Sequence, residues 1–206
     1  MSVLGLLHEI RAFAGKTKTT GLNDDAISRF LLSDPSLKTA IEDAYKAHAD
    51  LRESYADLLQ AEETQVLHAL QEDLVNFYPE DCVNPYIAIA AKGPWVVTSH
   101  GAVLHDSGGY GMLGFGHSPD GPINAMSKPW VMANVMSPSF SHTRLTTRLK
   151  KEIGHKRESC PFHQFICMNS GSESVTVAGR FSDINAQNVT APGARHAGKP
   201  GKFLAL

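Results

Sequence analysis

The sequence predicts an α/β protein, with helices in the first third of the chain and strands beginning in its middle. Apolar residues recur at three- and four-residue spacing between Ser36 and Leu74, the pattern of a helix with one buried face. After Tyr78 and Pro79 the apolar runs shorten, and Gly, Pro and His become frequent, as in strands joined by turns. The rest of the chain shows both patterns, so we expect both kinds of element there.

Two helical regions are expected before residue 77. The opening segment MSVLGLLHEIRAFAG reads as an amphipathic helix and lacks the basic start and long apolar run of a signal peptide. Residues 36–74 predict one long helix, or two with a break, and SDPS at residues 33–36 supplies a start signal in which a capping residue lies beside a proline. Such a long apolar stripe must pack against the body of the protein or against a second subunit.

Later segments predict strands first and then a mixture. YIAIAA and PWVVTSHGAVLHD read as strands, and SFSHTRLTTRLKKEIGHK reads as a helix. FHQFICMNS is expected to be a buried strand, whereas SESVTVAGRFSDINAQ fits either a strand or a helix. KPGKFLAL predicts a turn followed by a buried strand inside which the chain ends, so the sequence is expected to be part of a larger protein.

Composition argues against several classes of function. The 206 residues carry a formal net charge of -2, and 42% of them are hydrophobic, which is ordinary for a soluble globular protein. No dense Lys/Arg stripe with interleaved aromatics occurs, so no nucleic-acid partner is expected. No apolar stretch approaches the ~20 residues that cross a bilayer, so no membrane association is expected. Three cysteines without a C-x-x-C pair favour a reducing, cytoplasmic setting.

Two further patterns receive structural interpretations. Gly109, Gly111 and Gly114 match G-x-G-x-x-G, but the Gly- and Pro-rich residues after them do not predict the helix that a dinucleotide-binding loop needs. A mobile or close-packed loop is expected instead. The histidines within residues 100–117 lack the spacing of a zinc site, so no metal is expected.

The segment NSGSES, residues 169–174, allows two interpretations. If a strand precedes it and a helix follows, Gly171 and Ser172 lie at a helix N-terminus, where unpaired backbone N–H groups and the helix dipole favour a phosphate. Gly171 would permit close approach, and the Ser172 hydroxyl would add a donor. The other interpretation is a capped helix start with nothing bound, with Ser170 or Ser172 as the cap and Glu173 in the first turn.

NSGSESVTVAGRFSD resembles the phosphate-binding segment of class III aminotransferases, the pyridoxal-phosphate enzymes of fold type I. GAVLHDSGGYGMLGFGHSPD resembles an earlier signature of the same family, in which a strand ends in an Asp-containing turn and a Gly-rich loop closes on Gly-His. The two segments occur in the family's order. The similarity covers roughly residues 80–206, and the helical N-terminal third has no counterpart in it.

The resemblance implies a binding site for pyridoxal 5'-phosphate. Gly171 and Ser172, with Ser170 beside them, would hold the cofactor phosphate mainly through backbone N–H groups. The residues implied in the substrate pocket are Tyr110, Gly111 and Met112. The resemblance also implies a homodimer with active sites at the subunit interface, a small-molecule amino donor and a 2-oxo acid acceptor.

The resemblance further implies a domain order and an activity. Residues 1–76 would be a helical extension, residues 77–140 a small-domain segment with strands and the Gly-rich substrate loop, and residues 141–206 the start of the cofactor-binding large domain, a mixed sheet with flanking helices. The Schiff-base lysine and the Asp that pairs with the pyridine nitrogen would lie beyond Leu206, so this chain alone is expected to be inactive. The complete enzyme would transfer an amino group from an amino acid or amine to a 2-oxo acid. The alternative is a truncated, non-catalytic module that binds the cofactor or phosphate, or regulates, and associates through its N-terminal helices.

Overall fold

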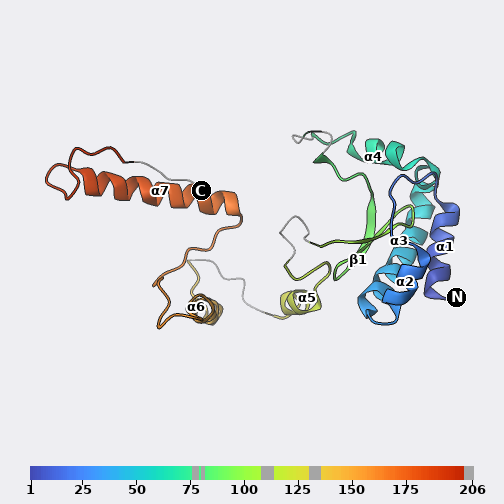
Figure 1. The fold of residues 1–206 in the computed structure, drawn as a ribbon, viewed down its shortest axis with the longest axis horizontal. Coiled ribbons are helices and arrows are strands. Elements are labelled where there is room, and N and C mark those ends of the chain that lie inside the picture. The colour runs from blue at the N-terminus through green and yellow to red at the C-terminus, as the bar shows by residue number, and fades with distance from the viewer. Residues whose placement is uncertain (76–78, 80–81, 108–113, 130–135, 202–206) are drawn as a thin grey trace. The chain divides into compact units, whose positions relative to one another are not determined.

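The computed structural model describes residues 1–75, 79, 82–107, 114–129 and 136–201 (Figure 1). These residues form seven α-helices and one three-stranded antiparallel sheet, so the predicted mixture of helices and strands is confirmed. The chain divides into two compact units, Met1–Trp130 and Val131–Leu206. The helices expected before residue 77 therefore belong to the same unit as the strands.

Of the helices in the first unit, α3 (Pro35–Gln60) begins at the SDPS signal read from the sequence, whereas α2 (Asp24–Leu31) was not expected. Ser2 caps α1 by accepting the N–H of Gly5 at 3.1 Å, which confirms the amphipathic helix predicted for the opening segment. Asp34 caps α3, its carboxylate accepting the N–H of Ser36 at 2.8 Å. The region predicted as one helix or two forms α3 and α4, which are separated at residues 61–62, and α3 is itself kinked at Tyr55. The bounds of the four helices are α1 Val3–Phe13, α2 Asp24–Leu31, α3 Pro35–Gln60 and α4 Glu63–Gln71.

The sheet confirms both predicted strand regions. Its strands β1 (Ala88–Lys92), β2 (Trp95–Thr98) and β3 (Val103–His105) lie in that order, and both neighbouring pairs are antiparallel. Gly93, with φ +57°, turns the chain between β1 and β2, and Gly101, with φ +74°, turns it between β2 and β3. Two tight turns therefore account for the order of the strands.

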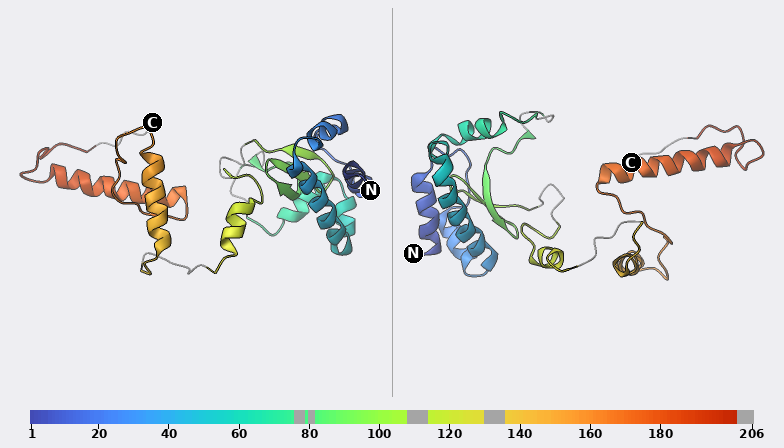
Figure 2. Two further views of the ribbon diagram at one scale, coloured as in Figure 1. Left: turned by 90° about the horizontal axis from the view of Figure 1, so that it is seen from below. Right: turned by 180° about the vertical axis from the view of Figure 1, so that it is seen from behind.

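The core of the first unit lies between the helices and the sheet (Figures 1 and 2). Helix α3 packs against β1 and β2, and α1 packs against α3, so the expectation that the long helical stripe packs on the body of the protein is confirmed. Each large apolar side chain buried here contributes about 1.5–3 kcal/mol to folding. The buried core consists of Leu7, Ile10, Ile27, Leu37, Ala40, Ile41, Ala44, Trp95, Val97 and Val103.

A short helix, α5 (Asp120–Met126), also belongs to the first unit. It begins after the Gly-rich loop, and its bounds do not include Gly114. A dinucleotide-binding loop requires a helix that opens within its glycines, so the position of α5 is consistent with the structural interpretation of that motif.

The second unit contains two helices, α6 (Phe140–Ile153) and α7 (Gly171–Thr190). The helix expected from SFSHTRLTTRLKKEIGHK is confirmed, and the ambiguous segment after Ser170 is a helix. The buried strand expected for FHQFICMNS is wrong. Its apolar side chains are mostly exposed, and residues 136–201 contain no strand to pair with it. A lone extended segment leaves its backbone N–H and C=O groups to water, so it does not form a strand.

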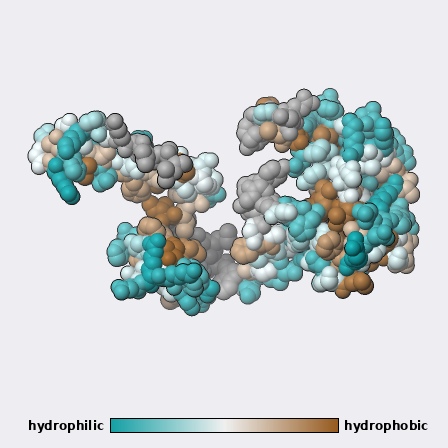
Figure 3. Space-filling model, in the orientation of Figure 1, coloured by the Kyte–Doolittle hydropathy of each residue, from teal (hydrophilic) through white to brown (hydrophobic). Residues whose placement is uncertain are grey.

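Helices α6 and α7 carry apolar side chains on their surfaces (Figure 3). No residue of either helix is fully buried. The mixed sheet of a fold-type-I large domain stays a prediction, and residues 202–206, where its next strand was expected, lie outside the described residues. Across the described ranges, no helix is both long and apolar enough to span a membrane. The exposed apolar residues of the two helices include Phe140, Leu145, Ile153, Val175, Phe181 and Ile184.

Candidate functional site

The start of α7 lies in the NSGSES segment. Ser170 has extended backbone angles, φ -146° and ψ 161°, and its hydroxyl accepts the N–H of Glu173 at 3.2 Å. The Glu173 carboxylate in turn accepts the N–H of Asn169 at 2.9 Å. These reciprocal bonds resemble a capping box and explain why the helix begins at Gly171. Both interpretations of this segment assumed a helix here, and the helix is present, whereas the strand assumed before it is not.

Three donors remain open at this helix end. The backbone N–H groups of Gly171 and Ser172, and the Ser172 hydroxyl, have no hydrogen-bond partner within the part of the chain that the structure describes. A Cβ placed on Gly171 would meet no heavy atom within 4 Å. A phosphate fits such an end, since the first N–H groups of a helix point outward and the dipole favours an anion. Capping by Ser170 is thus compatible with phosphate binding, which stays a prediction.

The residues implied in the substrate pocket belong to the Gly-rich segment before α5. Tyr110, Gly111 and Met112 fall in the range 108–113, which lies outside the described residues. Strand β3 precedes this range and α5 follows it, both within the first unit. The role of the loop in substrate binding stays a prediction.

The histidines within residues 100–117 have separate structural roles rather than a shared one. Within the described residues, no group of three or more His, Cys, Asp or Glu side chains is placed to hold a metal ion. Each of the three rings contacts a different part of the first unit. His100 bonds the Ser99 hydroxyl and the Ala61 carbonyl, each at 3.0 Å, His105 lies edge-on to Trp95 with ring centroids 5.0 Å apart, and His117 bonds Asp106 at 2.9 Å.

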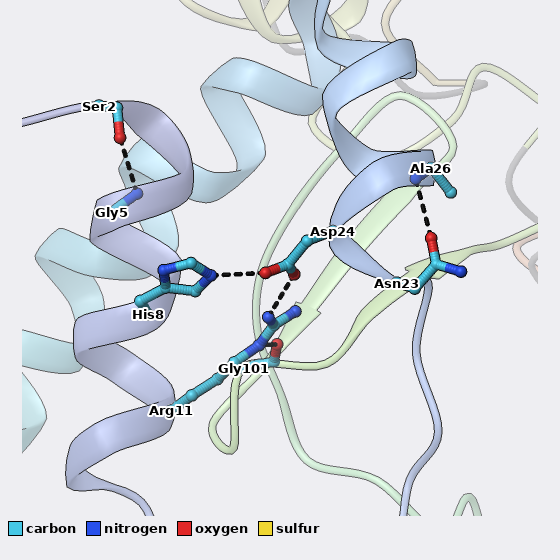
Figure 4. Close-up of polar contacts among 8 residues, drawn as sticks. All are labelled: Ser2, Gly5, His8, Arg11, Asn23, Asp24, Ala26 and Gly101. Carbon is cyan, nitrogen blue, oxygen red and sulfur yellow. Dashed lines mark hydrogen bonds and ion pairs between the residues drawn. The ribbon is translucent and has the colours of Figure 1, made fainter.

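A second candidate site, which the sequence pattern did not indicate, lies between α1 and α2 (Figure 4). Arg11 Nη1 donates to Asp24 Oδ1 at 2.6 Å, and Arg11 Nε donates to the Gly101 carbonyl at 2.9 Å. His8 Nε2 lies 2.6 Å from Asp24 Oδ2. Hydrogen bonds from Arg11 and then His8 hold the pKa of the Asp24 carboxyl below its ordinary value.

A buried carboxylate lies next to this second site. Glu63 is fully buried, and its Oε2 accepts the N–H groups of Lys18 and Thr19, each at 2.7 Å, and the Thr17 hydroxyl at 3.1 Å. Its Oε1 has no partner among the described residues. Burial alone would raise the pKa of Glu63, but the hydrogen bonds from Thr19 and Lys18 outweigh it, and the pKa is lowered. The Glu63 carboxylate therefore keeps its negative charge beside residues 17–19.

No protein-family model, curated protein or solved structure matches the chain.

Proposed function

We propose that this chain forms part of a pyridoxal-phosphate-dependent aminotransferase of fold type I, and that the start of α7 binds the cofactor phosphate. The complete enzyme would act in the cytoplasm as a homodimer and would transfer an amino group from an amino acid or amine to a 2-oxo acid. The observation that carries the proposal is that α7 begins within the family-like segment and that the N–H groups of Gly171 and Ser172 have no partner among the described residues.

The proposed roles of the residues follow from their geometry. Gly171 and Ser172 donate their backbone N–H groups to phosphate oxygens, and the Ser172 hydroxyl adds a third donor. Gly171 has open space where a side chain would begin, so the anion can approach the backbone. The Ser170 hydroxyl takes the N–H of Glu173, which orders the first turn that presents the donors. These contacts would anchor one end of the cofactor and so orient its ring.

The chemistry in this proposal is divided between the cofactor and residues outside this chain. When bound, pyridoxal phosphate supplies the electron sink on which transamination depends. No lysine of this chain lies in the sequence context of the family's Schiff-base lysine, and Lys199 belongs to the turn-rich segment after α7. The chain alone is therefore proposed to bind phosphate without transferring amino groups.

An NMR titration of the chain tests the phosphate site. Inorganic phosphate and pyridoxal phosphate should both shift the backbone amide signals of Gly171 and Ser172, whereas pyridoxal, which lacks the phosphate, should not. Gly171→Pro removes one N–H donor while keeping the helix, because proline is favoured at the first helical position and Ser170 is already extended. It should weaken phosphate binding about tenfold, the effect of losing one charge-assisted hydrogen bond.

Matched variants separate the donors. Ser172→Ala keeps the backbone N–H and should weaken binding less than Gly171→Pro does. Gly179→Ala, within α7 and with no heavy atom near its added Cβ, should leave binding unchanged. If phosphate fails to shift the two amides, or if Gly171→Pro binds it as tightly as the unaltered chain, α7 is a capped helix without an anion site and the proposed function loses its support.

A non-catalytic module is the second candidate function, and the complete cap formed by Ser170 and Glu173 is compatible with it. The gene product purified from its natural source distinguishes the two. An intact mass well above 22.3 kDa, together with amino transfer to a 2-oxo acid, supports the enzyme. Phosphate binding by a product of this mass without amino transfer supports the module.

A further inference from the structure

A cavity of about 450 Å³ lies in the first unit, within the range typical of small-molecule sites. It is bordered by the last turns of α1, the segment that leads into α2, and the turn between β2 and β3. All of these parts belong to one unit, so the cavity does not depend on the second unit. Its polar lining includes Arg11, Thr17, Thr19, Asp24 and His100.

Arg11 brings unused donors to this cavity. A guanidinium has five N–H donors, and Arg11 uses one on Asp24 and one on the Gly101 carbonyl. The other three have no partner in the residues that the structure describes. Arg11 can therefore keep its bond to Asp24 and still bind the carboxylate of a ligand. Figure 4 shows its bonds to Asp24 and Gly101.

Acceptors for a cation lie in the same cavity. Each oxygen of the Asp24 carboxylate receives one hydrogen bond, from Arg11 or His8, and each retains a free lone pair. Glu63 does not line the cavity, but its carboxylate accepts hydrogen bonds from Thr17 and Thr19, two of the lining residues. The ammonium group of Lys18, on the same segment, lies 3.8 Å from Glu62. A positive group in the cavity can therefore bind the Asp24 carboxylate, and the buried charge of Glu63 is one residue layer away through Thr17 and Thr19.

We propose that this cavity binds a small zwitterion of the α-amino-acid type, with its carboxylate on the unused N–H groups of Arg11 and its ammonium on Asp24. A simple anion would meet the Asp24 carboxylate, and a simple cation would meet the Arg11 guanidinium. A molecule with both charges pairs with each, and the threonine hydroxyls can accept further bonds from its ammonium. The site goes beyond the proposed function, since it uses none of the residues of α7.

A titration with three matched probes tests the proposal on the full chain. L-alanine carries both charges, propionate only the carboxylate, and ethylammonium only the ammonium. At equal ionic strength, L-alanine should shift the amide signals of residues 17–24 and 100–102 in a saturable way. Propionate and ethylammonium should bind at least about tenfold more weakly, because each lacks one charge-assisted contact.

Two variants address the two charges. Asp24→Asn keeps the shape of the side chain, and Arg11→Lys keeps the positive charge but loses the planar fork. Each should weaken L-alanine binding about tenfold or more. Asp43→Asn, in an exposed pair with Lys46 on α3, should leave binding unchanged.

Several results would overturn the proposal. They are no saturable shift with L-alanine, binding of propionate or ethylammonium as tight as that of L-alanine, and unaltered affinity in a folded Asp24→Asn chain. The probe comparison uses the unaltered protein, so it decides the matter even if the variants fail to fold. Phosphate binding at α7 is measured on other amides and succeeds or fails separately.

Discussion

The indole N–H of Trp95 donates a hydrogen bond of 2.7 Å to Oδ2 of Asp34. The other oxygen of Asp34 accepts the N–H of Ser36 and caps α3. The Asp34 carboxylate thus joins β2 to the start of α3. Trp95, on β2, is almost fully buried. The pKa of the Asp34 carboxyl lies below its ordinary value, and the hydrogen bond from Trp95 is the largest cause of this shift.

Replacing Asp34 should be among the costly substitutions at a helix start. Asp34→Ala removes the cap and leaves the Trp95 N–H unpaired, so we expect a loss of about 2–4 kcal/mol in the free energy of unfolding. Asp34→Ser restores a cap but does not reach the indole, and should recover about 1 kcal/mol of that loss. Urea titration followed by tryptophan fluorescence measures both. Asp43→Ala, at an exposed site, should cost under about 1 kcal/mol, and a similar cost for Asp34→Ala would contradict the role given to the Trp95 bond.

Removal of the buried Glu63 carboxylate should destabilise the first unit. Glu63→Ala leaves the N–H groups of Lys18 and Thr19 without their acceptor, at a cost of about 2–4 kcal/mol. Because the pKa of Glu63 is lowered from its ordinary 4.5, its contribution is present above that pH and lost as the pH falls through the lowered pKa. Unfolding curves at several pH values check both effects. The exposed Glu72→Ala is the control, and an equal loss there would count against this explanation.

His48 should make stability depend on pH in mildly acidic solution. Burial, then the charges of Arg52 and His100, lower its pKa from 6.5 to about 4. Arg52 donates to Nδ1 at 3.1 Å, and Nε2 has no partner among the described residues. Between these pKa values the unfolded chain binds the proton and the folded chain does not. Stability should therefore fall as the pH falls from 6.5 to 4, by up to about 3 kcal/mol.

The pH dependence is tested by comparing unfolding curves of two variants. His48→Gln should flatten the fall in stability between pH 6.5 and 4, because the titrating group is gone. His68→Gln, at an exposed histidine of α4, should retain it. Equal slopes for the unaltered chain and His48→Gln would show that other groups cause the pH dependence.

Gly101 should tolerate no side chain. Its φ of +74° is unfavourable for other residues, and an added Cβ would lie 2.5 Å from Cγ of Arg11. Gly101→Ala should cost about 1–3 kcal/mol in stability and weaken the bond from Arg11 to this turn. Gly121→Ala in α5, where the added Cβ meets nothing within 4 Å, should be neutral or slightly stabilising. Thermal unfolding of the pair decides the matter, and equal melting temperatures would refute the expectation.

Helix starts were predictable where the signal is local. The capping groups of α1, α3 and α7 lie within three residues of the N–H groups that they accept, so sequence spacing alone indicates them. The break after α3 and the turns at Gly93 and Gly101 likewise involve few neighbouring residues. The strand expected for FHQFICMNS failed for the opposite reason, because a strand needs hydrogen-bond partners from a distant segment and its apolar residues do not specify any.

The second candidate site could not have been predicted in the same way. Arg11 and Gly101 are 90 positions apart, and Glu63 lies 45 positions from Lys18. No spacing rule links such residues, and each is ordinary in its own stretch of sequence. Their contacts arise only when α3 packs on the sheet and brings the start of α4 beside the 17–19 segment.

By itself the sequence indicated α1, the α3–α4 region and the strand regions, because caps, turns and apolar periodicity act between near neighbours. It did not indicate α2, and it left the segment after Ser170 open between a strand and a helix. Tertiary structure alone decided that Trp95 bonds Asp34, that Glu63 is buried with one oxygen unpaired among the residues the structure describes, and that Arg11 and Asp24 share a cavity. These residues are far apart in the sequence, so they come into contact only when the elements pack together. Burial and hydrogen bonding then determine which groups are charged and which atoms they bond.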